Sequence, residues 1–215
     1  MPPMTARVHI DAIEDPDGAA DAAVEALLAG EVVLLPTDTV YGLGALPMDE
    51  AAMDELFAVK GRSTSTPIAV LCADVRQAAT LVAAEDEAAL RAVGDRWWPG
   101  PLTLVFPRRA GVELHLGDPV ETVGVRVPDH PLVQAVAERV GPVAVTSANR
   151  HGEPTVVTAE EAVLSLPGVR VIVDEGPLEG RASTVVDATR HPWRVLREGP
   201  LPAADIAEAG QPRLL

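Results

Sequence analysis

The sequence predicts an α/β fold built on a mixed sheet. Short apolar runs alternate with Ala-rich amphipathic stretches along most of the 215 residues, which is the pattern of strands joined by helices. The late apolar runs are separated by a single helical stretch, which indicates that some neighbouring strands run antiparallel. The length fits one domain, and we expect it to span residues 10–200, followed by a short C-terminal tail over 201–215.

The helices and strands follow from local signals. A first helix is expected over 20–29, because Gly30 supplies the residue that commonly ends a helix. The apolar run over 32–35 predicts a buried strand that ends at Pro36. Further helices are expected at 50–59, 74–83, 85–95, 131–139 and 158–165. Further strands are expected at 68–72, 102–106, 122–127, 142–146, 170–173, 183–187 and 193–197.

Composition excludes several classes of protein. The 17 basic and 32 acidic residues give a formal net charge of −15, which argues against a large surface for nucleic acid. The single cysteine, Cys72, rules out an internal disulfide and a Cys-based zinc site. No apolar stretch is long enough to span a membrane, and the first residues form no secretory signal, so we expect a cytoplasmic protein.

The common phosphate and metal motifs are absent from the sequence. There is no G-x-x-x-x-G-K-[ST] loop, no G-x-G-x-x-G after a strand, and no G-x-S-x-G hydrolase elbow. The five histidines are scattered and no H-E-x-x-H occurs, so no metal ligands are predicted. Any phosphate in this protein would therefore be bound by a less common device.

The first candidate site follows the strand over 32–35. Thr37, Thr39 and Tyr41 come directly after it, at the kind of position where α/β folds place their ligands. The alternative is a turn in which these side chains cap the backbone.

A second candidate lies at the end of the helix over 50–59. Lys60 and Arg62 flank a glycine there, and Lys60 is the only lysine of the chain. Two cations at this place would either bind phosphate or satisfy the terminal carbonyls of the helix. Taken in isolation, the pattern favours the second role; the one lysine in a chain that otherwise uses arginine argues for the first, since the two side chains are not interchangeable.

Further strands also end in polar groups. Arg126 lies in an apolar strand, where an unpaired charge is costly, so it needs an anion or a position at the mouth of a cleft. The other strand-end residues of this kind are Thr103, Ser147, Asn149, Ser183 and Arg197. Together they describe a cleft for a polar, anionic small molecule.

In order and content, these segments resemble the YrdC-like domain family over about residues 18–200. The matching segments are 36–44, 60–62, 100–103, 125–128, 147–149, 183–187 and 197–199. The resemblance implies an open, twisted mixed sheet flanked by helices around a large cleft. It also implies synthesis of threonylcarbamoyl-AMP from L-threonine, bicarbonate and ATP, with release of pyrophosphate. That product would serve threonylcarbamoyladenosine modification of tRNA next to the anticodon.

The resemblance also implies roles for individual residues. Those expected to bind ATP, together with Mg²⁺, are Lys60, Arg62, Thr103, Ser147, Asn149 and Arg197, with Lys60 and Arg62 as the catalytic cations. Those expected to bind threonine or to shape its pocket are Thr37, Thr39, Tyr41, Arg126 and Ser183. Downstream partners would be tRNA threonylcarbamoyl transferase proteins, while the net charge argues against stable binding of tRNA by this chain.

Two positions depart from the family pattern. Ser63 stands where a proline is usual, and Leu71 stands where some members carry a histidine. The length resembles the short, single-domain form of the family. Two alternatives remain open at this point: an RNA-binding module of the same fold, and a relative that forms carbamoyl-AMP.

Overall fold

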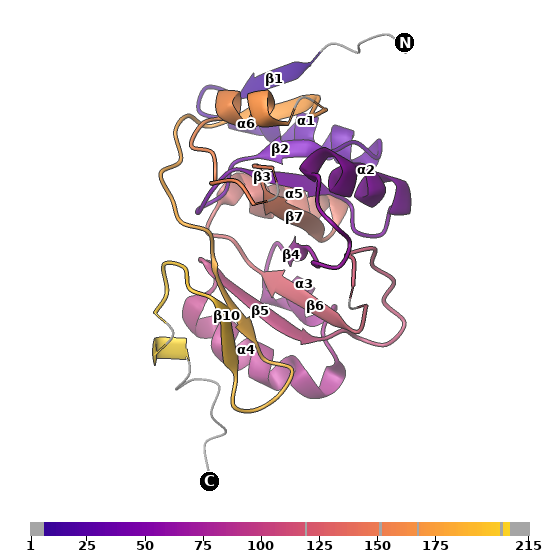
Figure 1. Ribbon diagram of the computed structural model, residues 1–215, viewed down its shortest axis with the longest axis vertical. Helices are drawn as coiled ribbons and strands as arrows, with labels where there is room; N and C mark the ends of the chain where they lie inside the picture. The colour runs from indigo at the N-terminus through magenta and orange to yellow at the C-terminus, as the bar shows by residue number, and fades with distance from the viewer. Residues whose placement is uncertain (1–6, 119, 151, 167, 203, 207–215) are drawn as a thin grey trace.

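A ten-stranded mixed sheet runs through the whole computed structural model, as far as its described residues show (Figure 1). The structure describes residues 7–118, 120–150, 152–166, 168–202 and 204–206. The strand order is β1-β8-β2-β3-β7-β4-β6-β5-β9-β10. The strands are β1 (Val8–Asp11), β2 (Val33–Leu35), β3 (Gly42–Ala45), β4 (Ala69–Leu71), β5 (Leu102–Pro107), β6 (Thr122–Arg126), β7 (Val143–Ser147), β8 (Val171–Asp174), β9 (Thr184–Asp187) and β10 (Arg194–Arg197).

Parallel and antiparallel pairs alternate irregularly across this sheet. β1, β8 and β2 are parallel neighbours, as are β4 with β6 and β5 with β9. The remaining neighbours pair antiparallel. The predicted α/β class with a mixed sheet is therefore confirmed.

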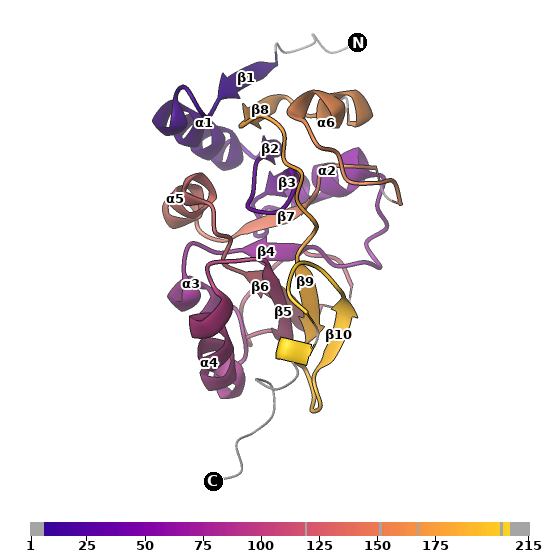
Figure 2. The same cartoon turned by 90° about the vertical axis from the view of Figure 1, so that its left-hand side faces the viewer.

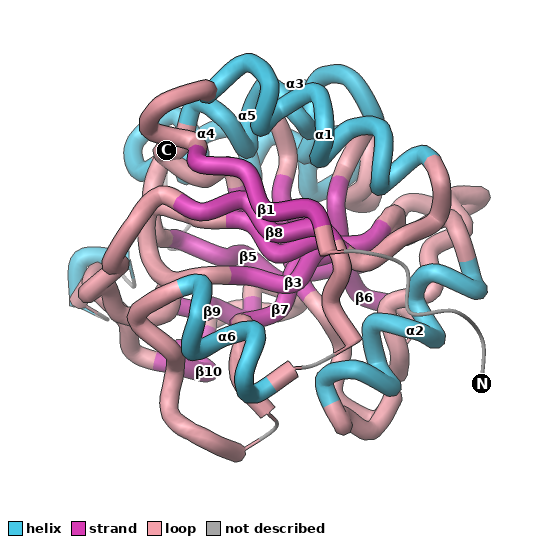
Figure 3. The backbone as a smooth tube through the Cα atoms, turned by 90° about the horizontal axis from the view of Figure 1, so that it is seen from above, coloured by secondary structure: helices cyan, strands magenta, loops and turns pink. Residues whose placement is uncertain are grey.

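Helices cover the sheet from both sides. They are α1 (Pro16–Leu28), α2 (Glu50–Lys60), α3 (Val75–Ala79), α4 (Glu87–Trp97), α5 (Pro131–Val140) and α6 (Ala159–Ser165), with a 3-10 turn at Ala84–Asp86. Figures 2 and 3 place α1, α3, α4 and α5 on one side of the sheet and α2 and α6 on the other. The chain between β8 and β9 passes from the upper to the lower part of the molecule in both ribbon views (Figures 1 and 2).

Local capping explains where the helices begin. Asp15 accepts a hydrogen bond from the backbone N–H of Gly18, and Pro16 occupies the first turn of α1, where its missing N–H is not needed. Asp49 caps α2 in the same way, and α2 ends at Gly61, whose φ of 63° is left-handed. This end of α2 fixes where Arg62 leaves the helix.

The core has two parts because the strands of the sheet are buried on both faces. Leu34 and Leu43 belong to the larger cluster, which also contains Leu56 of α2. Val33 and Leu35 belong to the second cluster, which α1 and α5 cover. Burying one such aliphatic side chain contributes roughly 1.5–3 kcal/mol to stability.

Several expected element boundaries were wrong. β1 and β3 were not predicted, because β1 is a short, mostly exposed edge strand and β3 contains two glycines. The first helix starts at Pro16 rather than at residue 20, and the helix expected over 74–83 ends at Ala79. The proposed tail over 201–215 stays a prediction, since 203 and 207–215 lie outside the described residues.

Candidate active site

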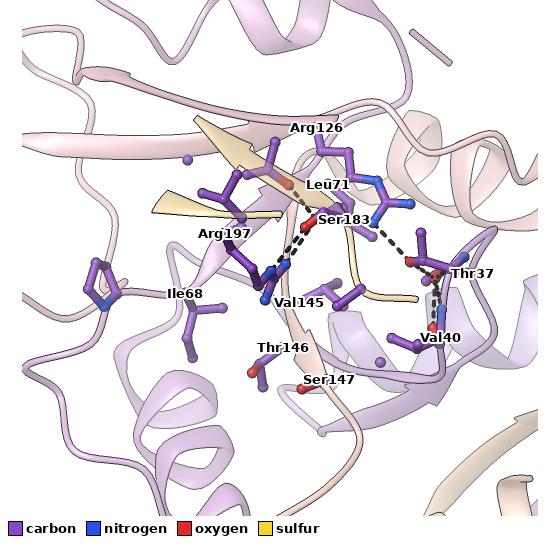
Figure 4. A pocket seen from close by; sticks show the side chains of 18 of the residues that line it. Thr37, Val40, Ile68, Leu71, Arg126, Val145, Thr146, Ser147, Ser183 and Arg197 are labelled. Carbon is purple, nitrogen blue, oxygen red and sulfur yellow. Dashed lines mark hydrogen bonds between the residues drawn. The ribbon is translucent and has the colours of Figure 1, made fainter. Parts of the chain in front are cut away.

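A cavity of ≈ 330 Å³ opens on the sheet beside the chain that joins β8 to β9 (Figure 4). This volume lies within the range of small-molecule sites. Nine residues of the predicted site line it: Thr37, Thr39, Tyr41, Arg62, Thr103, Arg126, Ser147, Ser183 and Arg197. The structure therefore brings together groups from segments that lie far apart in the sequence.

The described charged side chains that line the cavity are all positive. Arg62, Arg126 and Arg197 line it, and no Asp or Glu does so among the residues described. Burial lowers the pKa of each guanidinium, and the charge of Arg197 lowers that of Arg62 further, as the charge of Arg126 does for Arg197. Arg62 and Arg197, whose described contacts are carbonyl and hydroxyl oxygens, favour an anionic ligand in this cavity.

Arg126 is held from three sides at the end of β6. Its Nε donates to Gly100 O at 3.0 Å and its Nη1 to Thr39 Oγ1 at 3.1 Å. Its Nη2 donates to Asp38 Oδ1 at 2.6 Å, in an ion pair whose side chains are 6% and 11% exposed. The expectation that this arginine needs an anion is met by a protein carboxylate, which the sequence reasoning did not single out.

Arg197 binds the backbone and side chain of one residue. Its Nε donates to Ser183 O at 3.0 Å, and its Nη2 donates to Ser183 Oγ at 3.1 Å. Ser183 Oγ also lies 2.8 Å from Thr103 Oγ1. Figure 4 shows Arg197 and Ser183 pointing toward each other in the cavity.

Arg62 lines the cavity next to the end of β7. Its Nε and Nη2 donate to the carbonyls of Thr66 and Pro67, at 2.9 and 3.0 Å. Its Nη1 donates to Thr146 Oγ1 at 3.3 Å. These bonds turn the guanidinium toward the cavity without neutralising its charge.

Lys60 and Asn149 do not line this cavity. Lys60 is only 2% exposed, and its Nζ donates to Ser147 O at 2.5 Å, to Asn149 Oδ1 at 2.9 Å and to Asn149 O. Asn149 Nδ2 in turn donates to the carbonyls of Arg150 and Glu153. Lys60 therefore holds the turn that carries Ser147. Burial, with a smaller effect of the Arg62 charge, lowers the pKa of Lys60 to about 8.

Tyr41 anchors the chain that leaves β8. Its hydroxyl lies 2.9 Å from Asp174 Oδ1 and 2.7 Å from Gly176 O, and it accepts from the N–H of Glu175 at 3.0 Å. Burial raises the pKa of this hydroxyl. The ring lines the cavity, whereas the hydroxyl is occupied by the protein.

Two residues of this site were missed at the level of the sequence. Asp38 lies between the two predicted threonines, Thr37 and Thr39. It is the only carboxylate of the segment 36–44, and this was the feature of the sequence that could have indicated a role in the site. Gly180 packs so closely on Thr39 that a Cβ atom there would lie 1.7 Å from Thr39 O. No local pattern indicates that contact. Leu71, a departure from the family pattern, lines the cavity.

The fold and the cavity define the class: an α/β protein with a cationic pocket suited to a small anionic molecule. The chain belongs to the Sua5, YciO and YrdC family, whose model, described as "Telomere recombination", matches residues 25–199. The expected family membership is thereby confirmed.

Relatives of known name and structure agree with this assignment. A Mycobacterium tuberculosis protein is 42% identical over 189 residues, which is 87% of each chain. The threonylcarbamoyl-AMP synthase of Vibrio cholerae is 35% identical over 182 residues, covering 82% of this chain and 95% of its own length. The solved structure of Pyrococcus abyssi Sua5 complexed with L-threonine superimposes with a TM-score of 0.83 at 33% identity, and the match covers 95% of this chain and 61% of that one. The expected open, mixed α/β sheet is that of this solved structure.

Proposed function

We propose that this protein is a threonylcarbamoyl-AMP synthase. It joins L-threonine, bicarbonate and ATP into threonylcarbamoyl-AMP and releases pyrophosphate and water. The observation that carries this proposal is a cavity wall with three arginines and no carboxylate among its described residues, in a chain of net charge −15. The names of the relatives supply the reaction, and the cavity supplies the matching charge.

The two ends of the cavity suit the two kinds of substrate. The end with Arg62, Arg197 and Ser147 offers cations and a hydroxyl to the triphosphate. The end with Arg126 and Thr39 offers a guanidinium and a hydroxyl to the carboxylate and side chain of threonine. Lys60 supports the triphosphate end through the turn that carries Ser147.

The chemical step requires charge compensation and alignment. An oxygen of the threonine carbamate attacks the α-phosphorus of ATP, a P–O bond forms, and the bond to the pyrophosphate oxygen breaks. Negative charge grows on the leaving pyrophosphate, and the guanidinium groups of Arg62 and Arg197 would offset it. Holding the reactants in line supplies much of the remaining acceleration. We assign no general base.

Mg²⁺ would enter with ATP as part of the substrate. Among the residues described, no group of three or more His, Cys, Asp or Glu side chains could hold a metal ion. Magnesium commonly binds through substrate phosphates and water with few protein ligands, so the phosphates of ATP would hold the ion. When bound, the ion would neutralise phosphate charge.

Release of pyrophosphate with each substrate omitted in turn tests the proposal. We expect release only when ATP, threonine and bicarbonate are all present. Release that persists without threonine or without bicarbonate would refute the synthase activity. Salt-sensitive binding of RNA in the absence of ATP would instead favour the RNA-binding alternative.

The reaction also implies a place and partners. Threonylcarbamoyl-AMP would be consumed by tRNA threonylcarbamoyl transferase proteins, and both would act in the cytoplasm. Within the described part of the chain, no helix has the length and apolar character needed to cross a membrane.

A further inference from the structure

Asp38 is a carboxylate placed directly behind the cavity wall. It does not line the cavity, whereas its neighbours Thr37 and Thr39 both do. Its Oδ1 accepts from Arg126 Nη2 at 2.6 Å, and its side chain is 11% exposed. Asp38 pairs with Arg126, which does line the cavity, so it would act on a bound ligand through that guanidinium.

The ion pair divides the cavity into two electrostatic regions. Arg126 and Asp38 together carry no net charge. Arg62 and Arg197 bind only carbonyl and hydroxyl oxygens in the contacts that the structure describes. Their two charges are therefore left uncompensated. One end of the cavity is close to neutral and the other is doubly positive.

These two regions match the charges of the two substrates. An amino acid at neutral pH is a zwitterion, whose carboxylate is attracted by a guanidinium while its ammonium group is repelled by one. A carboxylate behind that guanidinium reduces the repulsion and leaves the directional hydrogen bonds in place. A triphosphate needs no such compensation.

We propose that Asp38 is a positioning residue that makes the Arg126 end of the cavity selective for zwitterionic amino acids over simple anions. This rests on the proposed function, because it assigns threonine to that end. Asp38 fixes the orientation of Arg126 toward Thr39 and sets the local charge. Without it, the same guanidinium becomes a general anion site.

The test compares threonine with an analogue that lacks the ammonium group. The probe is 3-hydroxybutyrate, used as a competitive inhibitor against threonine in the pyrophosphate-release assay. The measured quantity is the KM for threonine divided by the inhibition constant for 3-hydroxybutyrate. For Asp38→Asn, which is isosteric and neutral, we expect this ratio to rise roughly tenfold or more, because one unit charge about 4 Å away changes affinity by about fivefold in bulk water and by several hundred-fold near a protein surface. The KM for ATP should change much less.

Control variants separate this role from a structural one. Asp38→Glu keeps the charge and should keep the ratio within a few fold of the wild type. Asp74→Asn removes the carboxylate of an exposed ion pair with Arg76 outside the cavity and should leave the ratio unchanged. A purely structural Asp38 would weaken threonine and 3-hydroxybutyrate by the same factor, leaving the ratio constant in Asp38→Asn.

Each outcome decides a separate question. A constant ratio in a folded Asp38→Asn variant overturns the inference while the synthase assignment stands. Should Asp38→Asn fail to fold, as judged by circular dichroism, a tenfold change of the ratio in Asp38→Glu overturns it instead. A wild-type protein that releases pyrophosphate without threonine overturns the proposed function itself.

Discussion

Replacing Gly180 by alanine tests how the chain between β8 and β9 shapes the threonine end of the cavity. A Cβ atom at this position would lie 1.7 Å from Thr39 O and 2.6 Å from Thr39 C. Non-bonded carbon and oxygen atoms do not approach below about 3 Å, so the two backbone segments must separate by more than 1 Å. Gly180 has no positive φ, so alanine is excluded by the collision and not by backbone strain.

The displacement reaches Arg126 through Thr39. Thr39 Oγ1 lies 3.1 Å from Arg126 Nη1 and 3.0 Å from Thr37 Oγ1, and a shift of more than 1 Å breaks both contacts. Misplacement of about 1 Å at a reacting site costs roughly 100-fold in rate. We therefore expect Gly180→Ala to lower kcat/KM for threonine about 100-fold. Overpacking costs about 1–3 kcal/mol, which corresponds to a fall in Tm of about 2–12 °C for a chain of this size.

The assay is steady-state pyrophosphate release with threonine varied, together with Tm from circular dichroism. Gly111→Ala is the matched control, because Gly111 has a φ of 81° but no atom within 4 Å of its would-be Cβ. Alanine at Gly111 should lower Tm through backbone strain and leave kcat/KM unchanged. A Gly180→Ala variant with the kcat/KM of the wild type would refute the proposed contact between this chain segment and the substrate site.

Three other perturbations have defined outcomes. Activity should fall as pH rises through about 8, because deprotonation removes the charge of Lys60 and leaves two N–H groups, where the ammonium has three, for the four oxygens around Nζ. A flat profile from pH 7 to 9.5 would contradict this. Lys60 should not lower Tm over the same pH range. Its pKa is lower in the folded protein than in the unfolded chain, so between about pH 8 and 10.5 the unfolded chain holds more protons. The contribution of Lys60 to the free energy of unfolding therefore increases with pH. Arg62→Ala and Arg197→Ala should each raise the KM for ATP roughly 10- to 100-fold, because each removes one charged hydrogen-bonding group. Arg194→Ala, at an exposed position of β10, should leave this KM unchanged. Equal effects of all three substitutions would mean that only the total charge of the protein matters. Tyr41→Phe should lower stability by about 1–3 kcal/mol, seen in denaturant unfolding, because it leaves buried partners of the hydroxyl unpaired; unchanged stability would mean that water replaces those bonds.

The sequence by itself determined the layers of this protein and the residue types of its site. Apolar runs and Ala-rich stretches predicted the strands and helices, because burial and helix propensity act over a few neighbouring residues. The position of hydroxyls and cations after strands predicted a polar cleft. Even the carboxylate of Asp38 was in view, between Thr37 and Thr39, although nothing local indicated its partner.

Only the tertiary structure decided which of these groups act on a ligand and which act on one another. Asp38 meets Arg126 across 88 residues of chain, and Lys60 meets Asn149 across 89. Such contacts depend on strand order, register and sheet twist, and these are set by packing of the whole domain. For that reason the sequence could nominate Lys60 for a phosphate, and only the fold could place its ammonium group inside the turn that carries Ser147.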